Sequence, residues 1–208
     1  RVICPYGYRK SADGRMEPDE DAAGIVRQIF EWAADGNTAA EITRKLYAMN
    51  IPTPGEYRKS KGKDHYNVSR THGVWSSSTV LRMLEDQRYI GTYVIGKRKV
   101  REIGSRRVQL KDESEWFKIP DHHPAIVSME LFEKANASIR RFSLPNKKRR
   151  DYLLRGKVFC GCCDHAMSLR NGAWFYCRHS EVAKELPCYG VKVKMSELEQ
   201  VVFDTTRA

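Results

Sequence analysis

Apolar positions in the first quarter of the chain recur at helical spacing. From Asp19 to Asp35 they lie three and four residues apart behind an acidic first turn, and Gly36 ends the pattern. Thr38 and Glu41 then form a capping box that predicts a second helix, which ends near Asn50. Two short helices joined by a tight turn are typical of the first part of a helix-turn-helix arrangement.

Polar residues dominate the next stretch of sequence. Residues 52–74 contain several Pro, Gly, Lys and Arg, which predicts a long loop. A third helix is expected from Ser76 to about Asp86, with Ser76 as its cap. Further helices are predicted over residues 128–141 and from Ser196 onward.

Between the third and fourth helices the pattern changes to short β-strands. Residues that favour strands gather in four segments, and Gly104-Ser105 between the middle two suits a tight turn. The expected strands are Tyr93–Ile95, Val100–Ile103, Arg107–Leu110 and Trp116–Ile119. The chain is therefore expected to be α+β, with a helical, helix-turn-helix-like domain that carries a small β-hairpin or sheet.

The charge of the chain narrows the class of partner. A formal net charge of +11 in 208 residues, from 37 basic and 26 acidic side chains, indicates a polyanion. No apolar run is long enough to cross a bilayer, and the basic residues lie mostly in predicted strands and loops instead of on one amphipathic helix. Nucleic acid is therefore the expected partner, and no membrane partner is expected.

Cysteines near the C-terminus supply candidate metal chemistry. Cys160 and Cys163 are separated by two residues, the spacing of a zinc knuckle, and Cys177 and Cys188 follow. Four thiolates would complete one tetrahedral Zn²⁺ site, closed to substrate and therefore structural. The sequence thus predicts a small zinc-ribbon domain at the C-terminal end.

Other arrangements of the cysteines remain open. Disulfides would need an oxidising compartment, but the chain shows no signal peptide and its cysteines are clustered. Cys162 could replace a neighbouring ligand, and His165 or His179 could replace one sulfur.

Serine and basic residues form three groups of candidate DNA contacts. The first lies at the third helix, the second on the hairpin and the third between the two domains. In chain order they are Ser76, Ser77 and Arg82; Lys97, Arg98, Lys99, Arg101, Arg106 and Arg107; and Lys147, Lys148, Arg149 and Arg150. The alternatives are a helix that only packs and a solvated charge run, whereas a basic linker can follow a phosphate backbone.

Asp121-His122-His123-Pro124 raises the alternative of a metal-dependent nuclease of the His-Asn-His class. The downstream cysteines do not flank this segment in the pattern of that class, and an Asn at a suitable spacing is not evident. A turn before the helix of residues 128–141 is the favoured interpretation.

The ordered motifs resemble those of the large serine recombinases, the site-specific DNA integrases and transposases of mobile elements. Segments with this similarity run through nearly the whole chain. They are Pro5–Tyr8, Ala23–Phe30, Gly36–Leu46, Ile51–Gly55, Trp75–Leu84, Tyr89–Gly91, His123–Val127, Leu131-Phe132, Leu154-x-Gly156 and the cysteine segment with Met167. The resemblance also argues against the nuclease alternative.

The resemblance implies a domain order and a partner. Residues 1–142 would be the recombinase DNA-binding domain, 143–151 a basic linker, and 152–208 the zinc ribbon with its C-terminal helix. The chain would bind one attachment half-site of double-stranded DNA, within a parent that forms a dimer or tetramer at synapsis. A bacterial, cytoplasmic protein that joins the nucleoid when bound to DNA is expected.

The resemblance also implies where the chemistry lies. The family's catalytic domain, with its serine nucleophile, has no counterpart in these residues, so no catalytic residue is assigned and the chain itself is not expected to be an enzyme. The chain is expected to be a piece of a longer protein, because it begins at Arg1 without an initiator Met. A stand-alone zinc-ribbon regulator is the alternative; an RNA-binding protein is disfavoured because aromatic stacking motifs are not evident.

Overall fold

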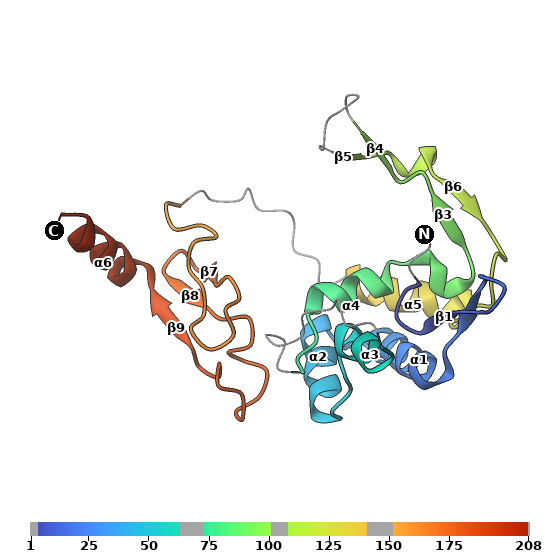
Figure 1. The fold of residues 1–208 in the computed structure, drawn as a ribbon, viewed down its shortest axis with the longest axis horizontal. Coiled ribbons are helices and arrows are strands. Elements are labelled where there is room, and N and C mark those ends of the chain that lie inside the picture. The colour runs from blue at the N-terminus through green and yellow to red at the C-terminus, as the bar shows by residue number, and fades with distance from the viewer. Residues whose placement is uncertain (1–3, 63–72, 101–107, 141–151, 208) are drawn as a thin grey trace. The chain divides into compact units, whose positions relative to one another are not determined.

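The computed structural model describes residues 4–62, 73–100, 108–140 and 152–207 (Figure 1). Helices and small antiparallel sheets are mixed in these residues, which confirms the predicted α+β class. The Cα packing divides the chain into two compact units, Arg1–Ile42 with Ser78–Ser143 and Thr43–Ser77 with Leu144–Ala208. None of the helices in the described part combines the length and the apolar character needed to span a bilayer.

The elements have the following bounds within the described residues. The helices are α1 (Glu20–Ala34), α2 (Ala39–Ala48), α3 (Pro54–Ser60), α4 (Ser77–Leu84), α5 (Met129–Arg140) and α6 (Met195–Arg207). The strands are β1 (Tyr8–Lys10), β2 (Met16–Pro18), β3 (Tyr93–Ile95), β4 (Arg98–Val100), β5 (Val108–Leu110), β6 (Phe117–Ile119), β7 (Ser168–Arg170), β8 (Trp174–Tyr176) and β9 (Lys192–Lys194).

Helices α1 and α5 pack against each other and form the centre of the first unit. Phe30 of α1 is fully buried, and its ring contacts Tyr89 at a centroid distance of 5.7 Å and Phe132 at 5.8 Å. Asn136 of α5 donates through Nδ2 to the carbonyl of Leu84, 2.8 Å away, which ties α5 to the end of α4. Aromatic packing and one half-buried amide therefore fix three helices.

The capping box predicted for α2 is present. Thr38 donates its backbone N–H to the Glu41 carboxylate at 2.7 Å, and its hydroxyl accepts from the Glu41 N–H at 3.3 Å. These bonds satisfy N–H groups that a helix start leaves without intrahelical partners.

The prediction of a continuous loop over residues 52–74 is wrong, because α3 begins at Pro54. Thr53 and Glu56 form a second capping box, in which the Thr53 N–H lies 2.8 Å from the Glu56 carboxylate. Pro54 occupies the first helical position, where its missing N–H costs nothing and its fixed φ suits a helix. Two of the residues that favoured a loop, Pro54 and Gly55, thus lie in the first turn of a helix.

Strands β3 to β6 form a two-stranded antiparallel ribbon that projects from the helices of the first unit (Figure 1). Strand β3 pairs with β6, and β4 pairs with β5. Among the described residues, β4 meets the predicted strand Val100–Ile103 at Val100, and β5 covers the end of the predicted strand Arg107–Leu110. The expected turn at Gly104-Ser105 lies outside the described residues. The β1–β2 hairpin was not predicted, since three-residue strands are too short to display an alternating pattern.

The C-terminal part contains a three-stranded antiparallel sheet in the order β7-β8-β9. Phe175 at the middle of β8 is fully buried among the residues that pack around the cysteines, and Tyr152 contacts its ring edge-on at 5.8 Å. Helix α6 follows β9 directly, one residue earlier than the predicted start at Ser196. The predicted domain boundaries at residues 142 and 152 stay a prediction.

Gly91 provides a test of packing in the first unit. Its φ is +80°, and a Cβ there would lie 2.7 Å from the carbonyl oxygen of His123. Gly91→Ala is therefore expected to lower the free energy of unfolding by more than about 2 kcal/mol, through both strain and the clash. Urea denaturation followed by circular dichroism measures the change.

Gly96→Ala is the matched control for that substitution. Gly96 has a similar φ of +76°, but a Cβ added there would meet no atom within 4 Å. Only the backbone strain of about 1 kcal/mol remains at this position. Equal losses in the two variants would contradict a close packing of the Gly91 turn against His123.

Candidate metal centre and basic surfaces

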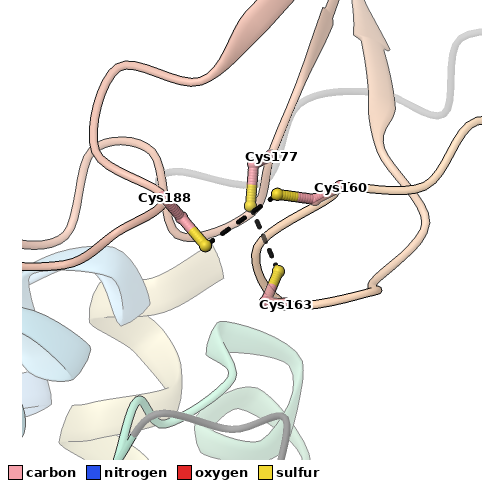
Figure 2. A group of neighbouring side chains, drawn as sticks. All are labelled: Cys160, Cys163, Cys177 and Cys188. Carbon is pink, nitrogen blue, oxygen red and sulfur yellow. Dashed lines mark hydrogen bonds between the residues drawn. The ribbon is translucent and has the colours of Figure 1, made fainter.

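Four cysteine side chains converge in the C-terminal part of the chain. Cys160, Cys163, Cys177 and Cys188 are all buried, and their sulfur atoms all lie within 4.8 Å of one another. Figure 2 shows them arriving from the knuckle, from the end of β8 and from the loop before β9. The Sγ atoms of Cys160 and Cys188 are 3.9 Å apart, and those of Cys163 and Cys177 are 3.5 Å apart.

These separations suit a metal ion and exclude disulfides in this conformation. Four ligands at the usual Zn–S distance of about 2.3 Å, placed at tetrahedral corners, have sulfurs about 3.8 Å apart. A disulfide would need sulfurs about 2.05 Å apart, and all these cysteines are free thiols. The donor set therefore fits a soft, tetrahedral ion such as Zn²⁺.

The three alternative ligands lie outside this group of four sulfurs. Cys162 is exposed, and its thiol donates to the carbonyl of Pro187 at 3.4 Å. The Nδ1 atom of His165 lies 3.0 Å from the carbonyl oxygen of Cys163, so that ring bonds to the backbone of the knuckle. The backbone N–H of His179 donates to the Cys177 sulfur at 3.4 Å. None of these three residues belongs to the group of four mutually close sulfurs, and the choice of ligands stays a prediction.

The knuckle backbone favours a thiolate at its first cysteine. Burial alone would raise the pKa of Cys160, but hydrogen bonds from the backbone N–H groups of Cys163 and Cys162 outweigh it and lower the pKa to about 7. Burial, with neighbouring thiols, raises the pKa of Cys188, and burial also raises the pKa of Cys177 to about 12. Without a metal the cluster therefore carries protons, which a bound ion must displace.

The three candidate contacts at the third helix occupy different positions in the structure. Helix α4 begins at Ser77, so Ser76 directly precedes it. Arg82 is exposed but folds back on its own helix, where Nε donates to the Ser78 carbonyl at 3.1 Å and Nη2 to the Thr79 hydroxyl at 3.3 Å. Val80, Met83 and Leu84 form the buried side of α4. A role of Ser76, Ser77 and Arg82 in DNA contact stays a prediction.

The described basic residues of the ribbon lie on both of its faces. Arg98 pairs with Leu110 and Lys99 with Gln109, so successive side chains point to opposite faces. The Lys97 ammonium lies 4.8 Å from the centre of the Trp116 ring, whose indole N–H donates to the Lys111 carbonyl. The remaining candidates, Arg101, Arg106, Arg107, Lys147, Lys148, Arg149 and Arg150, lie outside the described residues.

His123 has a structural position in the first unit. Its Nε2 lies 2.7 Å from the Arg88 carbonyl, so Nε2 carries the proton, and Nδ1 then accepts from Nδ1–H of His122 at 3.1 Å. The Tyr8 hydroxyl donates to the same Arg88 carbonyl at 3.0 Å. Burial lowers the pKa of His123, and the nearby His122 lowers it further. The segment thus forms the turn predicted before α5.

A basic and aromatic surface on the C-terminal sheet was not predicted. The β7-β8-β9 register places Arg170, Trp174 and Lys194 in one cross-strand row and Ser168, Tyr176 and Lys192 in the next. Phe175 lies on the opposite face, so alternation along β8 separates it from its two aromatic neighbours. The alternating pattern of Trp174-Phe175-Tyr176 and Lys192-Val193-Lys194 was the available signal.

A helical unit and a four-cysteine zinc-ribbon fold define the class of protein. The chain matches the recombinase family over residues 20–142 and the recombinase zinc beta ribbon domain over residues 153–207. It belongs to the recombinase family, and the predicted resemblance is confirmed.

Similar individual proteins are more distant. The uncharacterized protein y4bA/y4pH of Sinorhizobium fredii (strain NBRC 101917 / NGR234) is 28% identical over an alignment of 180 residues, and the match covers 78% of this chain and 25% of that protein. The chain thus spans about a quarter of that relative's length.

Two solved structures are similar over most of the chain. One comes from work on the sequence requirements of the Listeria innocua prophage attP site; it has a TM-score of 0.43 and 16% identity, and covers 97% of this chain and 76% of its own. The other is the crystal structure of an LSR–DNA complex, with a TM-score of 0.42 and 17% identity over 97% of this chain and 57% of its own.

Substitution of the cysteines tests the metal centre. Cys177→Ser is expected to release the metal and unfold the C-terminal part, because metal binding supplies on the order of 10 kcal/mol of folding free energy in small zinc domains. Cys162→Ser is the matched control and is expected to keep the metal. Zinc per chain, measured with a colorimetric indicator after denaturation, distinguishes them; equal zinc content would refute this ligand set.

A pH titration tests the environment of His123. Its lowered pKa means that the neutral form stabilises the fold above the ordinary pKa of about 6.5, and that this stability is lost as the pH falls through the lower folded value. His123→Gln keeps an N–H donor for the Arg88 carbonyl. The variant should therefore lose less stability than the parent chain between about pH 7 and pH 5 in urea denaturation. Parallel pH profiles would contradict this assignment.

Proposed function

We propose that this chain is the DNA-binding region of a site-specific large serine recombinase. The observation that carries this proposal is the ordered pair of matched family domains, recombinase followed by its zinc ribbon. The net charge of +11 supports a polyanionic partner. The chain would bind one attachment half-site of double-stranded DNA during integration, excision or transposition.

The ribbon of the first unit suits a groove of duplex DNA. The major groove accepts a two-stranded β-ribbon, and side chains on both ribbon faces then reach opposite walls of the groove. Arg98 and Lys99 lie on opposite faces and are exposed. In this proposal they contact phosphates on either side, and Arg101, Arg106 and Arg107 are proposed as further contacts.

One structural Zn²⁺ is proposed for the C-terminal part, held by Cys160, Cys163, Cys177 and Cys188. Support comes from the four buried sulfurs and from the match to the recombinase zinc ribbon. Four thiolates leave no position open for substrate, so the ion would stabilise the fold and take no part in chemistry.

The chain is proposed to bind DNA without cleaving it. In the parent protein, a serine of a separate catalytic domain would attack DNA phosphates in a synaptic dimer or tetramer. The energy kept in the phosphoserine bond would then drive religation without a high-energy cofactor. The linker of residues 143–151 would cross the backbone between the two domains.

Salt-dependent DNA binding tests the proposal. The purified chain, mixed with a fluorescent half-site duplex, should bind with an affinity that falls steeply with salt concentration. Arg98→Ala/Lys99→Ala should weaken binding on the order of tenfold and reduce the slope of log K against log salt by roughly 1.8, since each lost phosphate contact removes about 0.9.

Lys10→Ala/Lys134→Ala is the control, because it removes the same charge from exposed positions outside the ribbon. It should change the slope little. Binding that is insensitive to salt, or DNA nicking by the clean chain, would contradict the proposed function.

A further inference from the structure

The outward side of the C-terminal sheet, here called the outer face, consists of Ser168, Arg170, Trp174, Tyr176, Lys192 and Lys194. Leu169, Phe175 and Val193 form the matching row on the inner side, against the cysteine core. The side chains of the outer face therefore contribute little to the core, so the core does not require them to be apolar. Basic and aromatic side chains on it alternate across the three strands.

Cations on the outer face lie over its aromatic rings. The ammonium groups of Lys192 and Lys194 are 5.1 Å and 5.3 Å from the centre of the Trp174 ring. The guanidinium of Arg170 is 4.9 Å from the centre of the Tyr176 ring. Cation–π attraction at these distances holds long side chains in place, which reduces the entropy that they lose when they bind an anion.

The acidic neighbours distinguish these three cations. Nη1 of Arg170 donates to both carboxylate oxygens of Glu181, at 2.9 Å and 3.0 Å, so its charge is balanced locally. Lys194 has a longer contact with Glu197, 3.9 Å between Nζ and Oε1. Lys192 and Lys194 are thus the cations best placed to meet an external anion.

The placement of the lysines favours phosphates over bases. Two ammonium groups lie over the Trp174 ring, so a base that stacked on the same side of the ring would have to displace them. An ammonium group is a compact charge with three donors, which suits phosphate oxygens and carries no base preference.

We propose that the outer face of the zinc-ribbon sheet binds the phosphate backbone of nucleic acid, with Lys192 and Lys194 as the contacts and Trp174 as the ring that positions them. The inference rests on the proposed function and assigns this face a role in it. The outer face then contributes affinity that does not depend on base sequence, so base selection must come from other surfaces.

Lysine substitutions in the full chain test the outer face. Lys192→Ala/Lys194→Ala should lower the slope of log K against log salt by about 1.8 on duplex DNA and about 1.4 on a single strand of the same length. The loss should be the same for a half-site duplex and an unrelated duplex. Lys157→Ala/Lys184→Ala, which removes equal charge from the C-terminal part outside the sheet, should leave both slopes nearly unchanged.

The outcomes separate this inference from the proposed function. If the unaltered chain fails to bind duplex DNA, the proposed function fails with it. If the unaltered chain binds and the two double variants behave alike, only the outer face is excluded. Zinc content and melting temperature equal to those of the parent chain confirm that each variant is folded.

The ring and the neighbouring acid provide two further measurements. Trp174→Leu keeps apolar bulk but removes the ring, and should weaken binding about threefold on both duplex and single strand without changing the slope. A loss confined to the single strand would instead indicate base stacking and overturn the proposal. Glu181→Gln removes the carboxylate that balances the charge of Arg170, and should therefore steepen the duplex slope by about 0.9. An unchanged slope would show that Arg170 makes no phosphate contact.

Discussion

Four cysteine sulfur atoms lie close together in the C-terminal part of the chain, and the short strands around them depend on this cluster for their stability. Each strand of its sheet has three residues, and its core combines the cysteines with few large apolar side chains such as Phe175 and Leu154. So little apolar surface rarely stabilises a fold alone, which is why small domains use metals or disulfides. Because two of the thiolates precede β7 and the other two lie between β8 and β9, one ion would fix these segments together. The outer side of the sheet is then left available for basic side chains.

The first unit depends on a different kind of constraint. The carbonyl of Arg88 accepts from the Tyr8 hydroxyl and from His123, and the Tyr89 hydroxyl donates to the Tyr6 carbonyl. These bonds join the N-terminal hairpin, the turn after α4 and the turn before α5. Phe30 and Phe132 pack on the same cluster from α1 and α5. Buried polar bonds between distant turns are costly to break, so they hold the base from which the basic ribbon projects.

The sequence predicted the local parts of the site well and their surroundings less well. The knuckle spacing of Cys160 and Cys163 identified the metal cluster, because two residues between cysteines form a tight turn wherever they occur. The outer face of the sheet was missed, because the alternation along Trp174-Phe175-Tyr176 does not by itself show which side of the strand faces the core. Helix α3 was missed because Pro54 and Gly55 outweighed the Thr53–Glu56 capping box. Turn residues and first-turn residues are the same types, so composition alone could not separate them.

By itself, the sequence determined the helical periodicity of α1, α2 and α5, the cap at Thr38, the basic charge and the family motifs. Each of these depends on residues close together in the chain, so local chemistry decides it. Only the tertiary structure decided that the Cys162 thiol is exposed and lies outside the group of four sulfurs, that Arg98 and Lys99 lie on opposite ribbon faces, and that Lys192 and Lys194 meet over Trp174. These outcomes depend on strand register and on which distant segments pair. Register is set by the packing of a whole face, which no short stretch of sequence specifies.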